Sequence, residues 1–247
     1  MQVHECMMIN PITVSPKTKY AEAIRLLRLK KLAALPVVGK EGQLVGIVTE
    51  KDLLDISPVA VLGAHTISHL LSAIAVEEAM TRQVITVQED YPLEEAARML
   101  IVNKIGSLPV MRGDQLAGMI TKSDIFRAMT AALGGGSEGL RITIRLMEDK
   151  GEIGAITDGI VQLGGKLVSL STYWGDDPFK RVITLKVQGI NREELLMLLE
   201  WTIGVQVIDF CESRVVSQPA VISLARNTEI FSNQNPDAKI PWLLDSK

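Results

Sequence analysis

Apolar and polar positions in the first half of the chain form a pattern that occurs twice. Apolar stretches with the length of a β-strand recur at equivalent places: 12–14, 35–38 and 44–48 in the first copy, and 85–87, 108–111 and 116–120 in the second. After the first stretch of each copy, apolar residues at helical spacing predict an amphipathic helix, at 19–30 and at 93–103. The other two stretches flank a Gly-containing turn, which predicts a hairpin. Each copy therefore predicts the order β-α-β-β-α, because a second helix begins after the hairpin.

The second helix of each copy begins in the same motif, Gly-x-x-Thr-x-x-Asp, at Gly46–Asp52 and Gly118–Asp124. Two interpretations of this motif stay open. A threonine at a helix start with an acid three residues later forms a capping box, which a duplicated fold needs twice. The same pair suits a nucleotide, because the hydroxyl and free helix N–H groups donate to a phosphate while the carboxylate accepts from ribose hydroxyls. Spacing alone favours the cap.

A different pattern begins after the glycine-rich segment 134–139, which predicts a flexible linker. The expected order is then βαββαβ, with strands at 141–146, 166–173, 180–187 and 204–210 and helices at 153–163 and 192–202. Asn191 is the expected N-cap of the second of these helices. This order is the ferredoxin-like arrangement. The predicted class is therefore α+β: two β-α-β-β-α repeats packed as a pair, then a ferredoxin-like domain.

These patterns predict the domain boundaries. The parts are a repeat pair at 1–133, with copies at about 3–62 and 76–133, a linker at 134–139, a domain at 140–211 and a tail at 212–247. Residues 54–75, between the copies, suit either a plain linker or a segment that closes over a cleft. The tail contains the apolar group Ile240–Leu244, which would suit a docking peptide, but an extension without a structural role is the simpler interpretation.

Composition and charge argue against several classes of function. Hydrophobic residues form 47% of the chain and charged residues 22%, so the chain can bury a core. The net charge of −3 argues against a partner that is nucleic acid or an anionic membrane, and an aromatic content of 4% argues against stacking platforms. The chain has two separate cysteines, no apolar run of membrane-spanning length and no signal sequence, so a cytoplasmic protein is expected.

Neither a catalytic motif nor a metal site is predicted. His65 and His69 would share a helix face, but no third ligand accompanies them. No serine or cysteine nucleophile motif occurs. We therefore expect a ligand-sensing regulator without a cofactor rather than an enzyme.

The two copies, their Leu-Pro-Val-Val and Leu-Pro-Val-Met strands at 35–38 and 108–111, and the two Gly-x-x-Thr-x-x-Asp motifs resemble a tandem CBS domain pair, or Bateman module. The resemblance implies a homodimeric regulatory module with two clefts for an adenine nucleotide or adenosyl ligand: AMP, ADP, ATP, NAD or S-adenosylmethionine. The residues expected to bind it are Ile12, Thr13, Pro36, Thr49, Asp52, Ile85, Thr86, Pro109, Thr121, Lys122 and Asp124.

Basic residues that would face a polyphosphate are Lys31, Lys104, Lys122 and Arg127, and spacing does not choose among them. If only one cleft takes a phosphate-rich ligand, the second is favoured, because Lys122 stands where the first copy has the acidic Glu50.

The third part of the chain is similar to an ACT domain. Its first strand-to-helix turn reads Asp149-Lys150-Gly151-Glu152-Ile153, and the resemblance implies an amino-acid site at Asp149, Gly151 and Ile153. The alternative is that Gly151 only relieves a left-handed turn. A CBS pair followed by an ACT-type domain resembles a family of bacterial acetoin-utilisation proteins, which implies a partner enzyme in acetoin or acetyl-CoA metabolism. The competing hypothesis is a dimerising scaffold without a small-molecule ligand.

Overall fold

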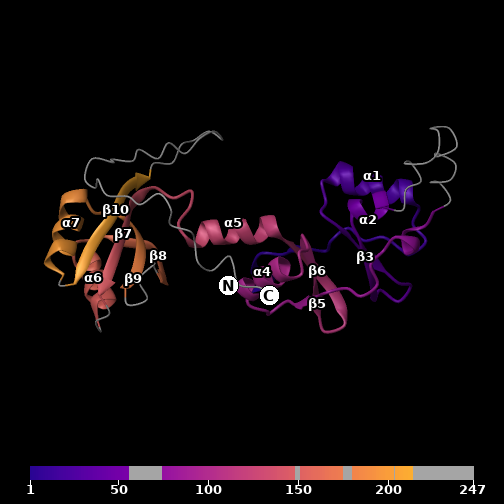
Figure 1. The fold of residues 1–247 in the computed structure, drawn as a ribbon, viewed down its shortest axis with the longest axis horizontal. Coiled ribbons are helices and arrows are strands. Elements are labelled where there is room, and N and C mark those ends of the chain that lie inside the picture. Colours follow the sequence, from indigo (N-terminus) through magenta and orange to yellow (C-terminus); the bar gives the residue numbers. More distant parts are fainter. Residues whose placement is uncertain (56–73, 148–150, 175–179, 203, 214–247) are drawn as a thin grey trace. The chain divides into compact units, whose positions relative to one another are not determined.

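The structure is a computed structural model that describes residues 1–55, 74–147, 151–174, 180–202 and 204–213. The chain divides into two units, Met1–Met129 and Thr130–Lys247 (Figure 1). Residues 240–244, His65 and His69 lie outside the described residues. No helix within the described ranges is long and apolar enough to cross a membrane.

The first unit contains both repeats, apart from the last three residues of α5 (Lys122–Ala132), 130–132. The first repeat consists of α1 (Tyr20–Lys30), the hairpin β2 (Leu35–Val38) and β3 (Leu44–Val48), and α2 (Glu50–Asp55). The second repeat consists of β4 (Val87–Gln88), α4 (Leu93–Val102), the hairpin β5 (Ser107–Arg112) and β6 (Gln115–Thr121), and α5 (Lys122–Ala132). The predicted hairpins and first helices therefore form at the expected places. The predicted strand at 12–14 is reduced to one bridge, between Val14 and Val37, and the strand expected at 85–87 forms at Val87–Gln88.

The opening segment of each repeat packs on the other repeat. Strand β1 (Met8–Ile9) pairs antiparallel with β6, and the equivalent residue Thr81 forms a bridge with Ile47 in β3. The 3-10 turns before these segments, Val3–Glu5 and Val76–Glu78, are exchanged in the same way. The N–H of Val3 donates to the carbonyl of Tyr91 at 3.0 Å, and that of Val76 donates to Thr18 at 2.9 Å. The two repeats thus complete each other.

Each repeat has its own hydrophobic core, and the exchange extends into both. Val3 is fully buried among the side chains of the second repeat, including Leu100 and Leu108. Val76 is fully buried among those of the first repeat, including Leu27 and Leu35. Because a buried valine contributes roughly 1.5–3 kcal/mol, each core depends on a residue supplied by the opening segment of the other copy.

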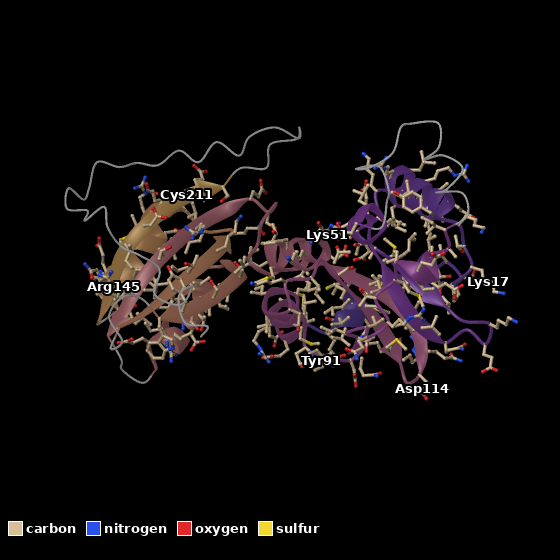
Figure 2. The ribbon with its side chains drawn as sticks, turned by 45° about the vertical axis from the view of Figure 1, so that its right-hand side comes forward. Lys17, Lys51, Tyr91, Asp114, Arg145 and Cys211 are labelled. Atoms are coloured by element: carbon tan, nitrogen blue, oxygen red, sulfur yellow. The ribbon has the colours of Figure 1, made fainter. Side chains whose placement is uncertain are left out.

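The second unit is a four-stranded antiparallel sheet with two helices. Its elements are β7 (Gly139–Met147), α6 (Glu152–Gln162), β8 (Lys166–Trp174), β9 (Lys180–Gln188), α7 (Arg192–Trp201) and β10 (Val205–Ser213). The strands lie in the order β10-β7-β9-β8. Asn191 caps α7 as predicted, because its side chain accepts from the Glu194 N–H at 2.8 Å. Figure 2 labels Arg145 on β7 and Cys211 on β10.

The glycine-rich segment is held against the sheet of the second unit. The Nζ of Lys186, in β9, donates to the carbonyl oxygen of Gly134 at 2.8 Å and to that of Ser137. Gly134 has φ +74°, and a Cβ there would lie 2.9 Å from the Lys186 side chain. This segment therefore forms a packed turn, with contacts that a linker composition alone does not predict.

Candidate functional site

The Thr-x-x-Asp pair forms a reciprocal cap in both repeats. In the first repeat, the N–H and hydroxyl of Thr49 donate to Oδ2 of Asp52 at 2.8 and 2.7 Å, and the Asp52 N–H donates to the Thr49 hydroxyl at 3.2 Å. In the second, Thr121 and Asp124 repeat these bonds at 3.0, 2.6 and 3.2 Å. The capping interpretation therefore holds for both copies. It uses one carboxylate oxygen of each aspartate and leaves the other available for a further contact.

The second carboxylate oxygen distinguishes the two copies. In the second repeat, Nη1 of Arg127 lies 3.2 Å from Oδ1 of Asp124. The side chain of Asp124 is 14% exposed, whereas that of Arg127 is 75% exposed. The equivalent position in the first repeat is Asp55, an exposed acid at the end of α2. The residue three positions after the capping aspartate is therefore a base in the second repeat and an acid in the first.

A small cavity lies between the repeats and brings two predicted site residues together. Its volume is about 30 Å³, and Thr121 of the second repeat and Ile12 of the first both line it. The other lining residues are Met8, Pro11, Leu32, Ala33, Ala34 and Met119. The cavity is therefore apolar on the first-repeat side, and Thr121 is the polar residue among those that line it.

Ile85 and Thr49 are the residues equivalent to Ile12 and Thr121 in the other copies of the repeat. Ile12 is 36% exposed and Ile85 37%, so both are accessible to a ligand. Thr13 is exposed and Thr86 half-buried.

Pro36 and Pro109 lie buried in β2 and β5, and neither is among the described residues that line the cavity. Their role as adenine walls stays a prediction.

Close packing explains why each motif begins with glycine, which spacing alone does not reveal. A Cβ on Gly46 would lie 2.6 Å from Sδ of Met80, and a Cβ on Gly118 would lie 2.6 Å from Sδ of Met7. Neither glycine has a positive φ, so the requirement is close packing rather than backbone conformation. Met7 and Met80 occupy equivalent places in the exchanged segments. A methionine at the end of each opening segment was the available sequence signal, but only tertiary structure pairs it with the opposite motif.

Charged residues differ around the two motifs. Lys122 is exposed, and its N–H donates to the carbonyl of Gly106 at 3.1 Å. Its counterpart Glu50 forms a 2.8 Å ion pair with Arg28. Lys51, labelled in Figure 2, follows Glu50 in α2.

The thiol of Cys6 belongs to the opening segment that packs on the second repeat. Burial raises its pKa, and the nearby carboxylates of Glu5 and Asp124 raise it further. The described residues contain no group of three or more His, Cys, Asp or Glu side chains that could hold a metal ion.

The amino-acid site expected in the second unit is only partly visible. Asp149 lies outside the described residues. Gly151 precedes α6 with φ +121°, and Ile153 is half-buried against the core of the second unit. The positive φ is consistent with the alternative interpretation, in which Gly151 serves the turn, and the amino-acid site stays a prediction.

Comparison with known proteins defines the first unit. Residues 3–58 and 76–131 each match the CBS domain family. The matches coincide with the two β-α-β-β-α repeats and include both Gly-x-x-Thr-x-x-Asp motifs. The chain therefore carries a tandem pair of CBS domains.

Several known proteins are similar to about half of this chain. Inosine-5′-monophosphate dehydrogenase of Aquifex aeolicus is 34% identical over 123 residues, which are 49% of this chain and 23% of the enzyme. The similarity thus spans less than a quarter of that enzyme.

Two solved structures are also similar. CBSX2 in complex with AMP is 30% identical, covers 52% of this chain and 95% of its own, and has a TM-score of 0.45. A Vibrio cholerae protein assigned to acetoin utilization, AcuB, is 29% identical, covers 54% and 93%, and has a TM-score of 0.47.

Proposed function

We propose that this protein is a non-catalytic regulator whose CBS pair senses an adenine nucleotide or adenosyl ligand. The observation that carries the proposal is the cavity between the repeats, which Thr121 and Ile12 both line. Apolar walls suit an adenine ring, and the adjoining hydroxyl and carboxylate suit a phosphate and a ribose. The cap that joins Thr121 and Asp124 at 2.6 Å holds the two side chains together, which supports this proposal.

The small size of the cavity supports a regulatory mechanism. Ligand pockets commonly measure about 300–1,000 Å³, whereas this cavity measures about 30 Å³. A nucleotide therefore enters only if the walls supplied by the two repeats separate. A ligand that binds the open arrangement better shifts the population toward it. Through that shift, the occupied cleft changes the surface that the CBS pair offers to a partner enzyme or a second copy.

Calorimetry with AMP, ADP, ATP, NAD and S-adenosylmethionine tests this function on the wild type, Asp52→Asn and Asp124→Asn. Asparagine keeps the size of the side chain and an acceptor for the cap, but it removes the negative charge that suits a ribose. We expect at least one ligand to bind the wild type and at least one substitution to weaken it. Asp114→Asn, in the turn between β5 and β6, is the matched control (Figure 2). If none of the five ligands binds the wild type, the scaffold hypothesis replaces this proposal.

We also propose that the second unit is an ACT-type domain that binds an amino acid and contributes to a homodimer. The βαββαβ order, the strand order β10-β7-β9-β8 and the glycine before α6 support this assignment. A partner in acetoin or acetyl-CoA metabolism follows from the resemblance to acetoin-utilisation proteins. An amino-acid panel in calorimetry, with and without nucleotide, tests the site; sedimentation of the full chain tests the dimer. A monomer without amino-acid binding would contradict both.

A further inference from the structure

The two motifs carry opposite charges at equivalent positions. Glu50 in the first repeat corresponds to Lys122 in the second, and Asp55 corresponds to Arg127. Arg28, which pairs with Glu50, corresponds to the apolar Ile101. Around the motif, Arg28, Glu50, Lys51 and Asp55 sum to zero charge in the first repeat, whereas their equivalents Ile101, Lys122, Ser123 and Arg127 sum to +2 in the second. The two sites share a fold and a motif but therefore differ in net charge. Such a difference affects an anionic ligand much more than a neutral one.

Arg127 is the basic residue that contacts the motif itself, through the carboxylate of Asp124. Its guanidinium contacts Oδ1 of Asp124, and Thr121 occupies Oδ2 of the same carboxylate. A ribose hydroxyl that binds Asp124 must therefore compete with Arg127 for Oδ1. The competition is weak, because an exposed ion pair with a single contact contributes little to stability.

The displaced guanidinium remains available. Its side chain is 75% exposed and is held by this one ion pair among the described contacts, so its other N–H donors can turn toward a ligand. Arginine binds phosphate oxygens through a planar set of donors, which makes a phosphate near Thr121 the natural second partner.

We propose that Arg127 is a specificity-determining residue that makes the cleft at Thr121 select 5′-phosphorylated adenine ligands over the corresponding nucleoside. In the empty cleft Arg127 neutralises Asp124; in the occupied cleft the ribose takes Asp124 and Arg127 pairs with the phosphate. The inference rests on the proposed function, since it requires that this cleft bind an adenine ligand. The first repeat has Asp55 at the equivalent position, so it lacks this selectivity.

The test compares AMP with adenosine by calorimetry in an Asp52→Asn background, which leaves the Thr121 cleft as the intact one. In this parent we expect AMP to bind more tightly than adenosine. Arg127→Ala should weaken AMP on the order of tenfold, because it removes a charged hydrogen bond to phosphate. Adenosine should bind as well as before or better, because Oδ1 of Asp124 is released. Arg127→Lys should restore part of the AMP affinity, and the salt dependence of AMP binding should fall in Arg127→Ala.

Arg98→Ala is the matched control, because Arg98 also forms an exposed ion pair with an acid three residues before it, Glu95, at 2.8 Å. It should change neither affinity. If the parent binds AMP and Arg127→Ala leaves the ratio of AMP to adenosine affinity unchanged, the role of Arg127 is wrong while the proposed function survives. An equal loss of both ligands would also contradict it, because that pattern indicates a structural role. Absence of binding by the wild type would overturn both proposals.

Discussion

Substituting Gly46 and Gly118 tests whether packing against the exchanged opening segments requires glycine at these positions. Alanine at Gly46 would place its Cβ 2.6 Å from Sδ of Met80, and 3.2 Å from the nearest backbone atom, the carbonyl oxygen of Thr81. Alanine at Gly118 would lie 2.6 Å from Sδ of Met7 and also 2.7 Å from the carbonyl oxygen of Met8. The first clash involves a flexible thioether that can move. The second involves β1 itself, which is paired with β6.

The magnitudes follow from this difference. Overpacking in a dense core typically costs about 1–3 kcal/mol. We expect Gly46→Ala to lower the free energy of unfolding of the first unit by about 1 kcal/mol, and Gly118→Ala by about 3 kcal/mol. Adding Met80→Ala to Gly46→Ala should reveal a favourable coupling of about 1 kcal/mol, because the shorter side chain makes room for the new methyl group.

Urea denaturation can separate the two units. Trp174 lies in β8 and Trp201 in α7, so in a Trp242→Phe background tryptophan fluorescence reports on the second unit. Far-UV circular dichroism reports on both. We expect the glycine variants to move the dichroism transition and leave the fluorescence midpoint in place. Equal costs for the two glycines, or a coupling energy of zero with Met80→Ala, would refute the packing explanation.

Three further predictions concern individual contacts. Asn191→Ala should lower the free energy of unfolding of the second unit by about 1 kcal/mol, seen as a lower fluorescence midpoint in urea, because the cap on the Glu194 N–H is lost; an unchanged midpoint would count against the cap. Burial lowers the pKa of Lys186, so the unfolded chain holds this proton to higher pH than the folded one. The stability of the second unit should therefore rise as pH increases from that lowered pKa toward the ordinary lysine value of about 10.4. Lys186→Met should abolish the rise, and a rise that persists would assign it to another group. Hydrogen bonding from Arg112 lowers the pKa of Glu89 below its ordinary value of about 4.3. The pair therefore stabilises the first unit above that pH, and this stabilisation is lost as pH falls through the lowered pKa. Glu89→Gln should make acid unfolding of the first unit less steep by dichroism, and an identical acid curve would disprove the contribution.

The elements with strong local patterns were predictable from the sequence. Strands β2 and β3 occupy the predicted residues 35–38 and 44–48, because each is an apolar run bounded by turn residues. The predicted strand 12–14 fails because only Val14 pairs with a neighbour. The exchange of the opening segments was not predictable, since β1 has only two residues and both are exposed. Its partner lies far along the chain, and local periodicity carries no information about such pairing.

For the candidate site, the sequence offered the Thr-x-x-Asp cap as one of two interpretations. The structure contains its hydrogen bonds in both repeats. That Ile12 meets Thr121 depends on how the repeats pack, which spacing does not encode. The ion pair of Arg127 with Asp124 follows from helical spacing, in which residues three apart share a face. Spacing left four basic residues equivalent, and only side-chain positions single out Arg127.

The exchanged opening segments have a consequence for synthesis of the chain. Residues leave the ribosome in order, at about 5–20 per second. The first repeat therefore emerges before Val76 and Thr81, which fill its core and extend its sheet. Met8 and Ile9 emerge earlier still, and β1 cannot pair until β6 has been synthesised. Until Thr81 emerges β3 lacks its partner at Ile47, and until β6 emerges β1 is unpaired. Unpaired strand edges attract other chains. The nascent protein is thus most vulnerable to aggregation before residue 121 appears, and the two domains reach their final form together.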